Sequence, residues 1–315
     1  MPDDLFGPLG PTRIIMERTV DGALMTREAV ILASREADAI LNQGEVRVDA
    51  GLLEQAPRLR IVANIARGFD NLDLDAMTRR GVWATNVPDA FTAPTAEVAL
   101  GLMLMVMRRL AEGDRSVRAG SWASFDPGRW DGHTLVGKTL GLIGFGLIGQ
   151  AVAERARAFG MSVLYHQRRR IDASGAVWAS LDDLLARADV VSLHVPATPE
   201  TYHLIDKDAF ASMRPGAVLI NTARGSVVDE QALVAALQSG RLGGAGLDVA
   251  EQEPRIDPVL RTMDNVVITP HLGGGTVESR LAARQHAIAN VAAVLRGERP
   301  LSPLNELPVA PAGGG

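Results

Sequence analysis

The stretch GLIGFGLIGQ, residues 141–150, places Gly144, Gly146 and Gly149 in the spacing G-x-G-x-x-G between an apolar run and a helical pattern. In this spacing the first glycine allows a tight turn, the second lets the backbone approach a pyrophosphate, and the third lets the helix pack closely on the strand. The amides at the start of the helix, around Leu147 and Ile148, would then face the anion. A tight turn with no ligand would also use glycines, but the strand before and the helix after favour a dinucleotide-binding loop.

Short β-rich runs alternate with helical stretches from residue 137 onward, which is typical of βαβ units that build a parallel sheet. The expected strands are residues 139–143, 162–165, 190–195, 217–221, 244–249 and 266–268. The helices between them include residues 149–158, 181–186 and 230–239. This alternation predicts a doubly wound domain around the glycine loop.

A second, weaker set of strands precedes this domain, at residues 13–16, 39–41, 60–63 and 82–85. Two longer helices, residues 94–110 and 276–295, flank the central unit. We therefore expect an α/β fold of two doubly wound domains. A Rossmann cofactor domain, residues 94–281, would be inserted into a smaller flavodoxin-like substrate domain made of residues 1–93 and 282–315.

The composition narrows the classes of partner. The 315 residues carry a net charge of -5, so no global positive field recruits nucleic acid or an anionic membrane, and a small anionic substrate needs local cations. The chain has no cysteine, which excludes disulfides and thiolate sites, and no cluster of histidines and carboxylates has metal-ligand spacing. The start of the chain lacks the pattern of a signal peptide, and the apolar run 98–107 is too short to span a bilayer. We expect a cytoplasmic protein without a metal.

The end of the second expected strand indicates which dinucleotide is preferred. Residues 166–170 read HQRRR, where a carboxylate would be needed to bond the ribose 2′-hydroxyl of NAD. Gln167 followed by Arg168 and Arg169 instead offers planar donors that suit a 2′-phosphate. A solvated basic loop is the alternative interpretation. The pattern favours NADP(H), with NAD(H) as a possible second cofactor.

Three further segments follow expected strands, at the sheet edge where an open α/β fold binds its ligands. They are NTARG at residues 221–225, LDVAEQEP at 247–254 and TPHLGGG at 269–275. Reduction of a 2-oxo acid needs a guanidinium that grips the carboxylate and an acid that protonates the carbonyl oxygen. Arg224 and His271 supply these two groups, and a carboxylate such as Glu253 would raise the pKa of the imidazole. Taken one at a time, each residue could equally serve a structural role.

From residue 60 to about 303 the chain resembles the D-isomer-specific 2-hydroxyacid dehydrogenases. It carries their glycine loop, N-x-x-R-G, L-D-V-x-x-x-E-P and P-H-x-G motifs in that order. The resemblance implies that Arg224 binds the substrate, that His271 is the acid and base, and that Glu253 pairs with it. It also implies that Asp248 contacts the nicotinamide carboxamide. Further cofactor contacts are expected at Thr95, His194, Val195, Pro196, Thr201, Thr222, Ala223 and Gly273.

The substrate loop departs from the family pattern. Residues 65–71 read IARGFDN, where relatives usually have G-V-G-x-D-N with backbone amides on the substrate carboxylate. Arg67 adds a cation there, so Arg67 and Gly68 are expected to bind substrate, together with Arg280. The segment is also similar to phosphite dehydrogenase, but the spacing between Glu253 and His271 is that of hydroxyacid enzymes. An Arg67 turned to solvent is the alternative. Compared with the family, the sequence before residue 13 is shorter by about one strand and most of a helix, so we expect either a reduced sheet in the smaller domain or a chain that was assigned a late start.

These observations predict a reductase of a small 2-oxo acid of the glyoxylate or hydroxypyruvate type, or the reverse oxidation of the D-2-hydroxy acid. Phosphite oxidation is the rival within enzymes, and a dinucleotide-sensing corepressor is the rival from another class. The histidines His133, His203 and His286 have no comparable context. The length and apolarity of the helix at 94–110 predict a homodimer, in which this helix and the segment 114–136 would cross to the partner.

Overall fold

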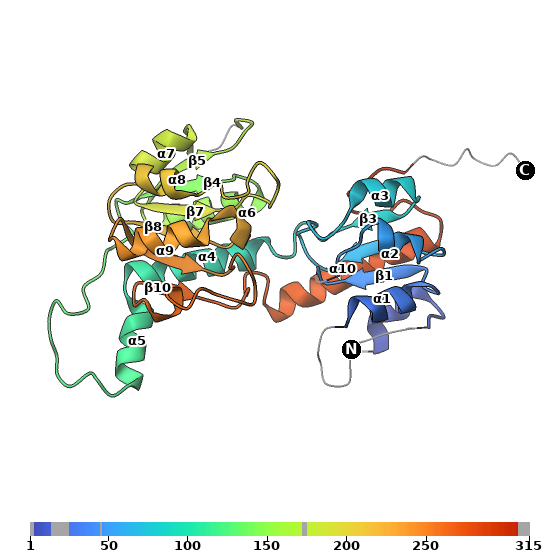
Figure 1. Ribbon diagram of the computed structural model, residues 1–315, viewed down its shortest axis with the longest axis horizontal. Coiled ribbons are helices and arrows are strands. Elements are labelled where there is room, and N and C mark those ends of the chain that lie inside the picture. Colours follow the sequence, from blue (N-terminus) through green and yellow to red (C-terminus); the bar gives the residue numbers. More distant parts are fainter. Residues whose placement is uncertain (1–2, 14–24, 45, 172–174, 308–315) are drawn as a thin grey trace, which may run out of the picture. The chain divides into compact units, whose positions relative to one another are not determined.

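The computed structural model describes residues 3–13, 25–44, 46–171 and 175–307. The chain divides into two compact units (Figure 1), one made of residues 1–91 and 276–315 and the other of residues 92–275. We call the first the small unit and the second the dinucleotide unit. The predicted fold class, α/β with parallel sheets and a Rossmann-like domain, is confirmed.

The dinucleotide unit is built on a seven-stranded parallel sheet in the order β10-β9-β8-β7-β4-β5-β6. The strand order reverses between β4 and β7, and in open α/β sheets such a switch point is where ligands bind. Buried apolar side chains on both faces explain why the central strands read as continuous apolar runs. The strands are β4 (Thr139–Ile143), β5 (Ser162–His166), β6 (Val177–Trp178), β7 (Val190–Leu193), β8 (Ala217–Asn221), β9 (Leu242–Leu247) and β10 (Val266–Ile268).

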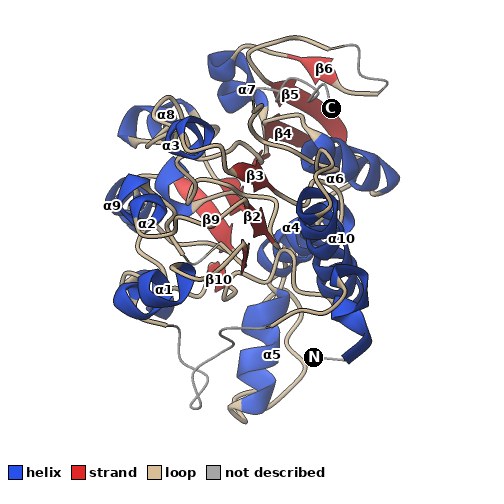
Figure 2. Ribbon diagram, turned by 90° about the vertical axis from the view of Figure 1, so that its right-hand side faces the viewer, coloured by secondary structure: helices blue, strands red, loops and turns tan. Residues whose placement is uncertain are grey.

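Helices cover both faces of this sheet (Figure 2). On one face pack α4 (Thr92–Met107) and α6 (Leu147–Ala158), and on the other α7 (Leu181–Arg187), α8 (Lys207–Ser212) and α9 (Glu230–Gln238). Side-chain caps at Ser180, Asp206 and Asp229 fix the starts of the last three helices. Short 3-10 turns lie at Gly225–Val227 and Leu260–Thr262.

The small unit has a three-stranded parallel sheet, β1-β2-β3, within the residues described. Its strands are β1 (Ala39–Asn42), β2 (Ile61–Asn64) and β3 (Trp83–Thr85), and its helices are α1 (Arg27–Ser34), α2 (Ala50–Glu54), α3 (Leu74–Arg79) and α10 (Val277–Leu295). A 3-10 helix, Asp3–Leu9, precedes these elements in the chain. Most of the strand expected at 13–16 lies outside the described residues.

The long helix predicted over 94–110 is wrong at its C-terminal end. α4 stops at Met107, and a separate helix, α5 (Leu110–Arg118), begins after Arg109, whose φ of 53° is left-handed. The stop has a tertiary cause, because the amide of His133 donates to the carbonyl of Met107 at 2.7 Å. The two-residue edge strand β6 is absent from the sequence prediction, and β9 begins and ends two residues earlier than expected.

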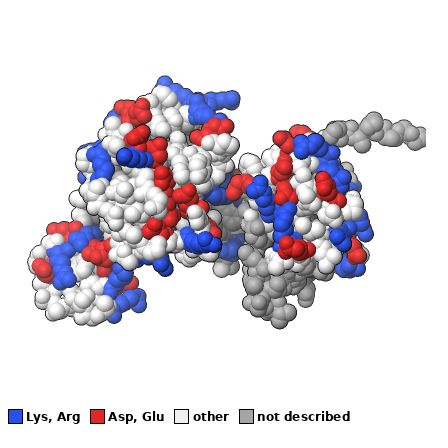
Figure 3. Space-filling view, viewed as in Figure 1, with Lys and Arg blue, Asp and Glu red and all other residues white. Residues whose placement is uncertain are grey.

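Charge is mixed over the part of the surface that Figure 3 draws. Figure 3 shows acidic and basic side chains interspersed on the face in view, which agrees with the net charge of -5. Among the described helices, none combines the length and apolarity needed to cross a bilayer.

Candidate active site

The glycine loop has the steric profile of a phosphate cradle. Gly144 has a φ of 93°, and a Cβ there would lie 2.6 Å from the carbonyl oxygen of His194; a Cβ on Gly149 would lie 2.4 Å from the oxygen of Gly144. At Gly146, by contrast, a Cβ would meet no atom within 4 Å. α6 starts at Leu147 with no side-chain cap, so its first amides remain available. The loop thus fits the pyrophosphate of a dinucleotide.

The basic loop after β5 presents its arginines to solvent. Arg168 and Arg169 are exposed, and the Gln167 side chain donates to the carbonyl of Arg169 at 2.6 Å. The indole of Trp178 donates to the carbonyl of Gln167 at 3.3 Å. These bonds shape the turn without using either guanidinium.

The segment after β7 lies against the glycine loop at the switch point. His194 is half-buried, its Nε2 lies 2.9 Å from the hydroxyl of Ser192, and its Nδ1 is inaccessible to solvent and has no partner in the described structure. Burial lowers the pKa of His194 to about 4, so the ring is neutral near pH 7. Thr201 donates to the carbonyl of Pro196 at 2.6 Å, which closes the turn that follows Val195. His194 and Thr201 therefore fix the backbone beside the glycine loop, where the cofactor site is predicted.

The loop after β8 carries Arg224. The buried side chain of Asn221 donates to the carbonyl of Arg224 at 3.0 Å and accepts the amide of Ala223 at 3.0 Å. This fixes the backbone on both sides of the arginine, while the guanidinium donates to the carbonyl of Ala223 at 2.8 Å. The neighbouring Thr222 hydroxyl is buried with no partner among the described residues.

The Arg224 loop and the loop that carries Glu253 are in direct contact. A Cβ on Gly225 would lie 1.9 Å from the carbonyl oxygen of Ala250, so the contact requires glycine. A histidine strengthens this junction, because Nε2 of His203 lies 2.6 Å from Oε1 of Glu251 and the His203 amide donates to the carbonyl of Ser226. Sequence reasoning missed this pair, since 48 residues separate its members.

Asp248 organises the loop after β10. Its carboxylate is buried and accepts the hydroxyl of Thr269 at 2.5 Å and the amides of Leu272 and Gly273 at 2.7 Å each. The Thr95 hydroxyl donates to the carbonyl of Gly273 at 3.1 Å. Two residues predicted to contact the cofactor, Thr95 and Asp248, thus meet at this loop.

His271 and Glu253 form a hydrogen-bonded pair, with 2.9 Å between Nδ1 and Oε2. The His271 backbone has a φ of 54°, and its amide donates to the carbonyl of Asp248, which sets the direction of the ring. The bond to Glu253 raises the pKa of His271, against the opposing effects of burial and of the Arg224 charge. Burial opposes ionisation of Glu253, but the bond from His271 and the amide of Ala250 hold the pKa of this carboxyl below its ordinary value.

The small unit holds the other predicted substrate residues. The guanidinium of Arg67 donates to the carbonyl of Pro88, and the carbonyls of Arg67 and Gly68 accept the side chains of Asn86 and Asn64. Arg280 lies in the first turn of α10 and is exposed.

The structure therefore brings three of the predicted groups into one electrostatic cluster, since the charge of Arg224 acts on both Glu253 and His271. Their arrangement supplies an anion-binding cation and an acid whose proton is stabilised by a carboxylate. In the described parts of the chain no group of three or more potential ligands could hold a metal ion.

Comparison with known proteins defines the family. Residues 100–273 match the model of the D-isomer specific 2-hydroxyacid dehydrogenase, NAD binding domain. The chain is 43% identical over 288 residues to a glyoxylate reductase of Pyrococcus furiosus, covering 89% of this chain and 86% of that one. This chain belongs to the D-isomer-specific 2-hydroxyacid dehydrogenase family, and it is an oxidoreductase that uses a nicotinamide dinucleotide.

Solved structures agree with this assignment. A Thermus thermophilus protein is 42% identical with a TM-score of 0.86, covering 90% of this chain and 91% of its own. An NADPH-dependent glyoxylate/hydroxypyruvate reductase of Sinorhizobium meliloti, solved with NADP and malonate, is 34% identical with a TM-score of 0.82. That match covers 92% of this chain and 89% of the relative.

Proposed function

We propose that the protein reduces a small 2-oxo acid of the glyoxylate or hydroxypyruvate type to the D-2-hydroxy acid, with NADPH as the preferred donor. The observation that carries the proposal is the pair of His271 and Glu253 beside Arg224. The relatives named as glyoxylate reductases at about 43% identity support the substrate class. The small unit would bind substrate and the larger unit the dinucleotide, as the two domains were assigned from the sequence.

Each residue of the cluster has a separate task. The guanidinium of Arg224 grips the substrate carboxylate and polarises the carbonyl. Because Glu253 occupies Nδ1 of His271, Nε2 is the nitrogen that gives its proton to the carbonyl oxygen. The carboxylate of Glu253 stabilises the imidazolium until the proton leaves. When bound, the nicotinamide supplies the hydride that adds to the carbonyl carbon.

The preference for NADPH rests on Arg168 and Arg169. Both guanidinium groups lie on the surface after β5, and a ribose 2′-phosphate could recruit them as charge-assisted donors. No carboxylate occupies residues 166–170 to bond a free 2′-hydroxyl. The remaining proposed cofactor contacts are those described above, from Thr95 to Gly273.

The test of the proposed activity is oxidation of NADPH with a panel of 2-oxo acids that includes glyoxylate, hydroxypyruvate and pyruvate. We expect the highest kcat/KM on one of the first two. Formation of NAD(P)H from phosphite would support the phosphite alternative instead. Tight binding of the dinucleotide without turnover of any 2-oxo acid would favour a dinucleotide-sensing corepressor.

We further propose that two copies of the chain form a dimer through α5 and the segment up to residue 136, which we call the arm. Its apolar side chains face solvent, with exposed fractions of 55% for Val117, 56% for Trp122 and 84% for Phe125. Figure 1 shows this part extending from the rest of its unit. Single exposed apolar residues are ordinary, but several on one extended segment indicate a covered surface.

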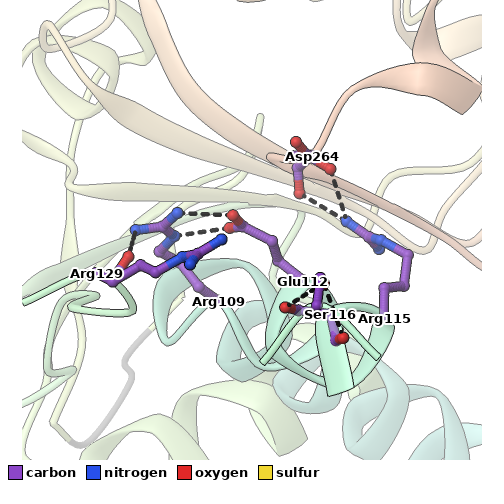
Figure 4. A network of polar contacts seen from close by, with 7 residues as sticks. Arg109, Glu112, Arg115, Ser116, Arg129 and Asp264 are labelled. Atoms are coloured by element: carbon purple, nitrogen blue, oxygen red, sulfur yellow. Dashed lines mark hydrogen bonds and ion pairs between the residues drawn. The ribbon is translucent and has the colours of Figure 1, made fainter. Parts of the chain in front are cut away.

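The base of the arm is held in place by charged groups (Figure 4). Arg109 makes a bidentate bond to Glu112 at 2.7 Å and donates to the carbonyl of Arg129 at 2.9 Å. Arg115 donates to the backbone of Asp264 at 3.2 Å. The base of the arm is thus fixed by bonds within its own unit, which would lower the entropic cost of association.

Light scattering at micromolar concentration tests the dimer. We expect twice the chain mass for the natural protein and a monomer for the variant Phe125→Ser with Trp122→Ser. A monomeric natural protein would contradict the assembly and leave the proposed chemistry intact. The cytoplasmic location stays a prediction.

A further inference from the structure

We propose that Asn64 and Asn86 are positioning residues that aim the backbone amides of Gly68 and Phe69 at an anionic group of the substrate. The inference rests on the proposed function, because the anion would be the carboxylate of the 2-oxo acid. The resemblance to the family already implies that backbone amides of this loop bind the carboxylate, and the inference adds that two buried asparagines orient them.

The two asparagines bond to two successive carbonyl groups of the substrate loop, residues 65–71. Nδ2 of Asn86 donates to the carbonyl of Arg67 at 2.7 Å, and Nδ2 of Asn64 donates to the carbonyl of Gly68 at 3.1 Å. Asn64 is fully buried and Asn86 is 9% exposed. A buried carboxamide that gave up either bond would leave polar atoms without partners, so these bonds are costly to break.

Because the peptide unit is planar, the direction of each backbone N–H follows from the direction of the carbonyl that the asparagine holds. In a planar trans peptide the N–H points opposite to the C=O of the same unit. The amide of Gly68 must therefore point away from Asn86, and the amide of Phe69 away from Asn64. Within the described structure neither amide donates to another backbone carbonyl. Successive amides that turn toward the same point form a binding surface for anions, and the proposal places the amides of Gly68 and Phe69 in that arrangement.

Each asparagine is itself fixed by further bonds. Asn64 also donates to Oδ1 of Asn71 at 2.8 Å, and Asn71 donates to the carbonyl of Val46 at 2.9 Å. The loop is thereby tied to a segment that precedes β2 in the chain.

The support for Asn86 comes from the C-terminal part of the small unit. Its carbonyl accepts the hydroxyl of Ser302 at 2.6 Å, and Ser302 is held by the buried Asn290 of α10. The guanidinium of Arg67, bonded to the carbonyl of Pro88, keeps a positive charge on the same loop. Both amides are thus preorganised, so ligand binding needs little reordering.

The experiment measures anion binding separately from turnover. Oxalate, which carries carboxylates but cannot be reduced here, is titrated by calorimetry into the protein saturated with NADP. We compare the natural protein with Asn86→Ala and Asn64→Ala. The matched control is Asn305→Ala, because Asn305 is a buried asparagine of the same unit that bonds the backbone of Val82 and Ala84 instead of the loop.

We expect Asn86→Ala and Asn64→Ala to raise the Kd of oxalate by about ten- to a hundredfold, the usual cost of a lost charge-assisted hydrogen bond. The KM for the 2-oxo acid should rise in parallel, while the Kd of NADPH stays unchanged. Asn305→Ala should lower the melting temperature and leave the Kd of oxalate unaltered. If Asn64→Ala does not fold, Asn86→Ala and Asn86→Ser still decide the matter.

Three results would overturn the inference: no binding of oxalate by the natural protein, an unchanged Kd in the folded loop variants, or an equal loss in the Asn305 control. Failure of the proposed function has a different signature. The natural protein would then bind oxalate yet reduce no 2-oxo acid, and the role of the two asparagines would be judged from the oxalate Kd alone.

Discussion

As proposed, the two units would bind a negatively charged ligand in opposite physical ways. The dinucleotide unit uses charged side chains at strand ends that remain open to solvent, with 49% of the His271 side chain and 39% of the Glu253 side chain exposed. The small unit would use buried neutral amides, such as that of Asn64, which donates to the carbonyl of Gly68 and would thereby orient backbone N–H groups. Charged groups near solvent titrate and act on the developing charge of the reaction. Neutral amides do not titrate, so their effect should appear in binding alone.

The largest effect should come from His271→Gln. Loss of the proton donor is expected to lower kcat for reduction by about a hundred- to ten-thousandfold, the range usual for general acid catalysis. Stopped-flow or steady-state oxidation of NADPH measures it, and the Kd of NADPH should hardly change.

His203→Gln is the matched control, because His203 also pairs with a glutamate of the same unit, at 2.6 Å from Glu251. We expect this variant to keep most of its turnover, since His203 supports the loops and carries no proton to the substrate. Equal losses of kcat in the two histidine variants would contradict the assignment of a chemical role to the pair of His271 and Glu253 and a structural role to the pair of His203 and Glu251. Full turnover in His271→Gln would overturn the mechanism.

A smaller effect should follow from Arg224→Lys. An ammonium cannot reproduce the two-pronged grip of a guanidinium, so KM for the 2-oxo acid should rise by about tenfold or more. Because the carbonyl is then held less well in line, kcat should fall too. The loop variant Asn86→Ala should change KM and spare kcat. An identical split of KM and kcat in Arg224→Lys and Asn86→Ala would show that the two units do not differ in the way described.

Substitution in the basic loop after β5, residues 166–170, should change only the affinity for the cofactor. Arg168→Ala should weaken NADPH by about ten- to a hundredfold through the lost charge-assisted contact and leave NADH nearly unchanged. Fluorescence titration of both cofactors measures the two Kd values. Arg170→Ala, in the same exposed run, serves as the matched control. Equal losses for NADPH and NADH would mean that Arg168 supports the fold of the loop.

The features that could be predicted from the sequence are those with a local pattern of residues. Strands β4, β8 and β10 begin and end where their apolar runs do, because buried parallel strands have a local signature. The motif residues Arg224, Glu253 and His271 follow such strands, so their clustering was predictable from the order of elements. The roles assigned to them stay predictions.

What sequence reasoning missed depends on contacts between distant residues. The end of α4 at Met107 is set by the amide of His133, and the bond from Ser302 to Asn86 joins residues 216 positions apart. Neither contact leaves a local pattern of hydrophobicity or turn residues. Asn221 was within a recognised motif, yet its role in fixing the backbone of Arg224 is visible only from the geometry.

The smallest and most specific effect concerns pH, in the variant Glu253→Gln. The carboxylate raises the pKa of His271, so in the natural protein the acid form of the imidazole persists to higher pH. Glutamine keeps an oxygen that accepts the Nδ1 proton but lacks the charge, and the pKa of His271 should therefore fall. Reduction requires the acid form of His271. As the pH is raised, the activity of Glu253→Gln should therefore begin to decline at a lower pH than that of the natural protein, with little loss on the acidic side.

Profiles of kcat/KM against pH, measured for reduction of the same 2-oxo acid, test this shift. Asn86→Ala provides the comparison, since a neutral amide in the other unit should lower kcat/KM by a similar factor at every pH and leave the position of the alkaline limb unchanged. If the limb stays in place in Glu253→Gln, the carboxylate serves only to orient the ring. If it moves in Asn86→Ala, the two units do not act independently on the bound substrate. Movement in the glutamate variant alone would assign retention of the His271 proton to the carboxylate of Glu253, while the contribution of the small unit would be judged from the KM of Asn86→Ala.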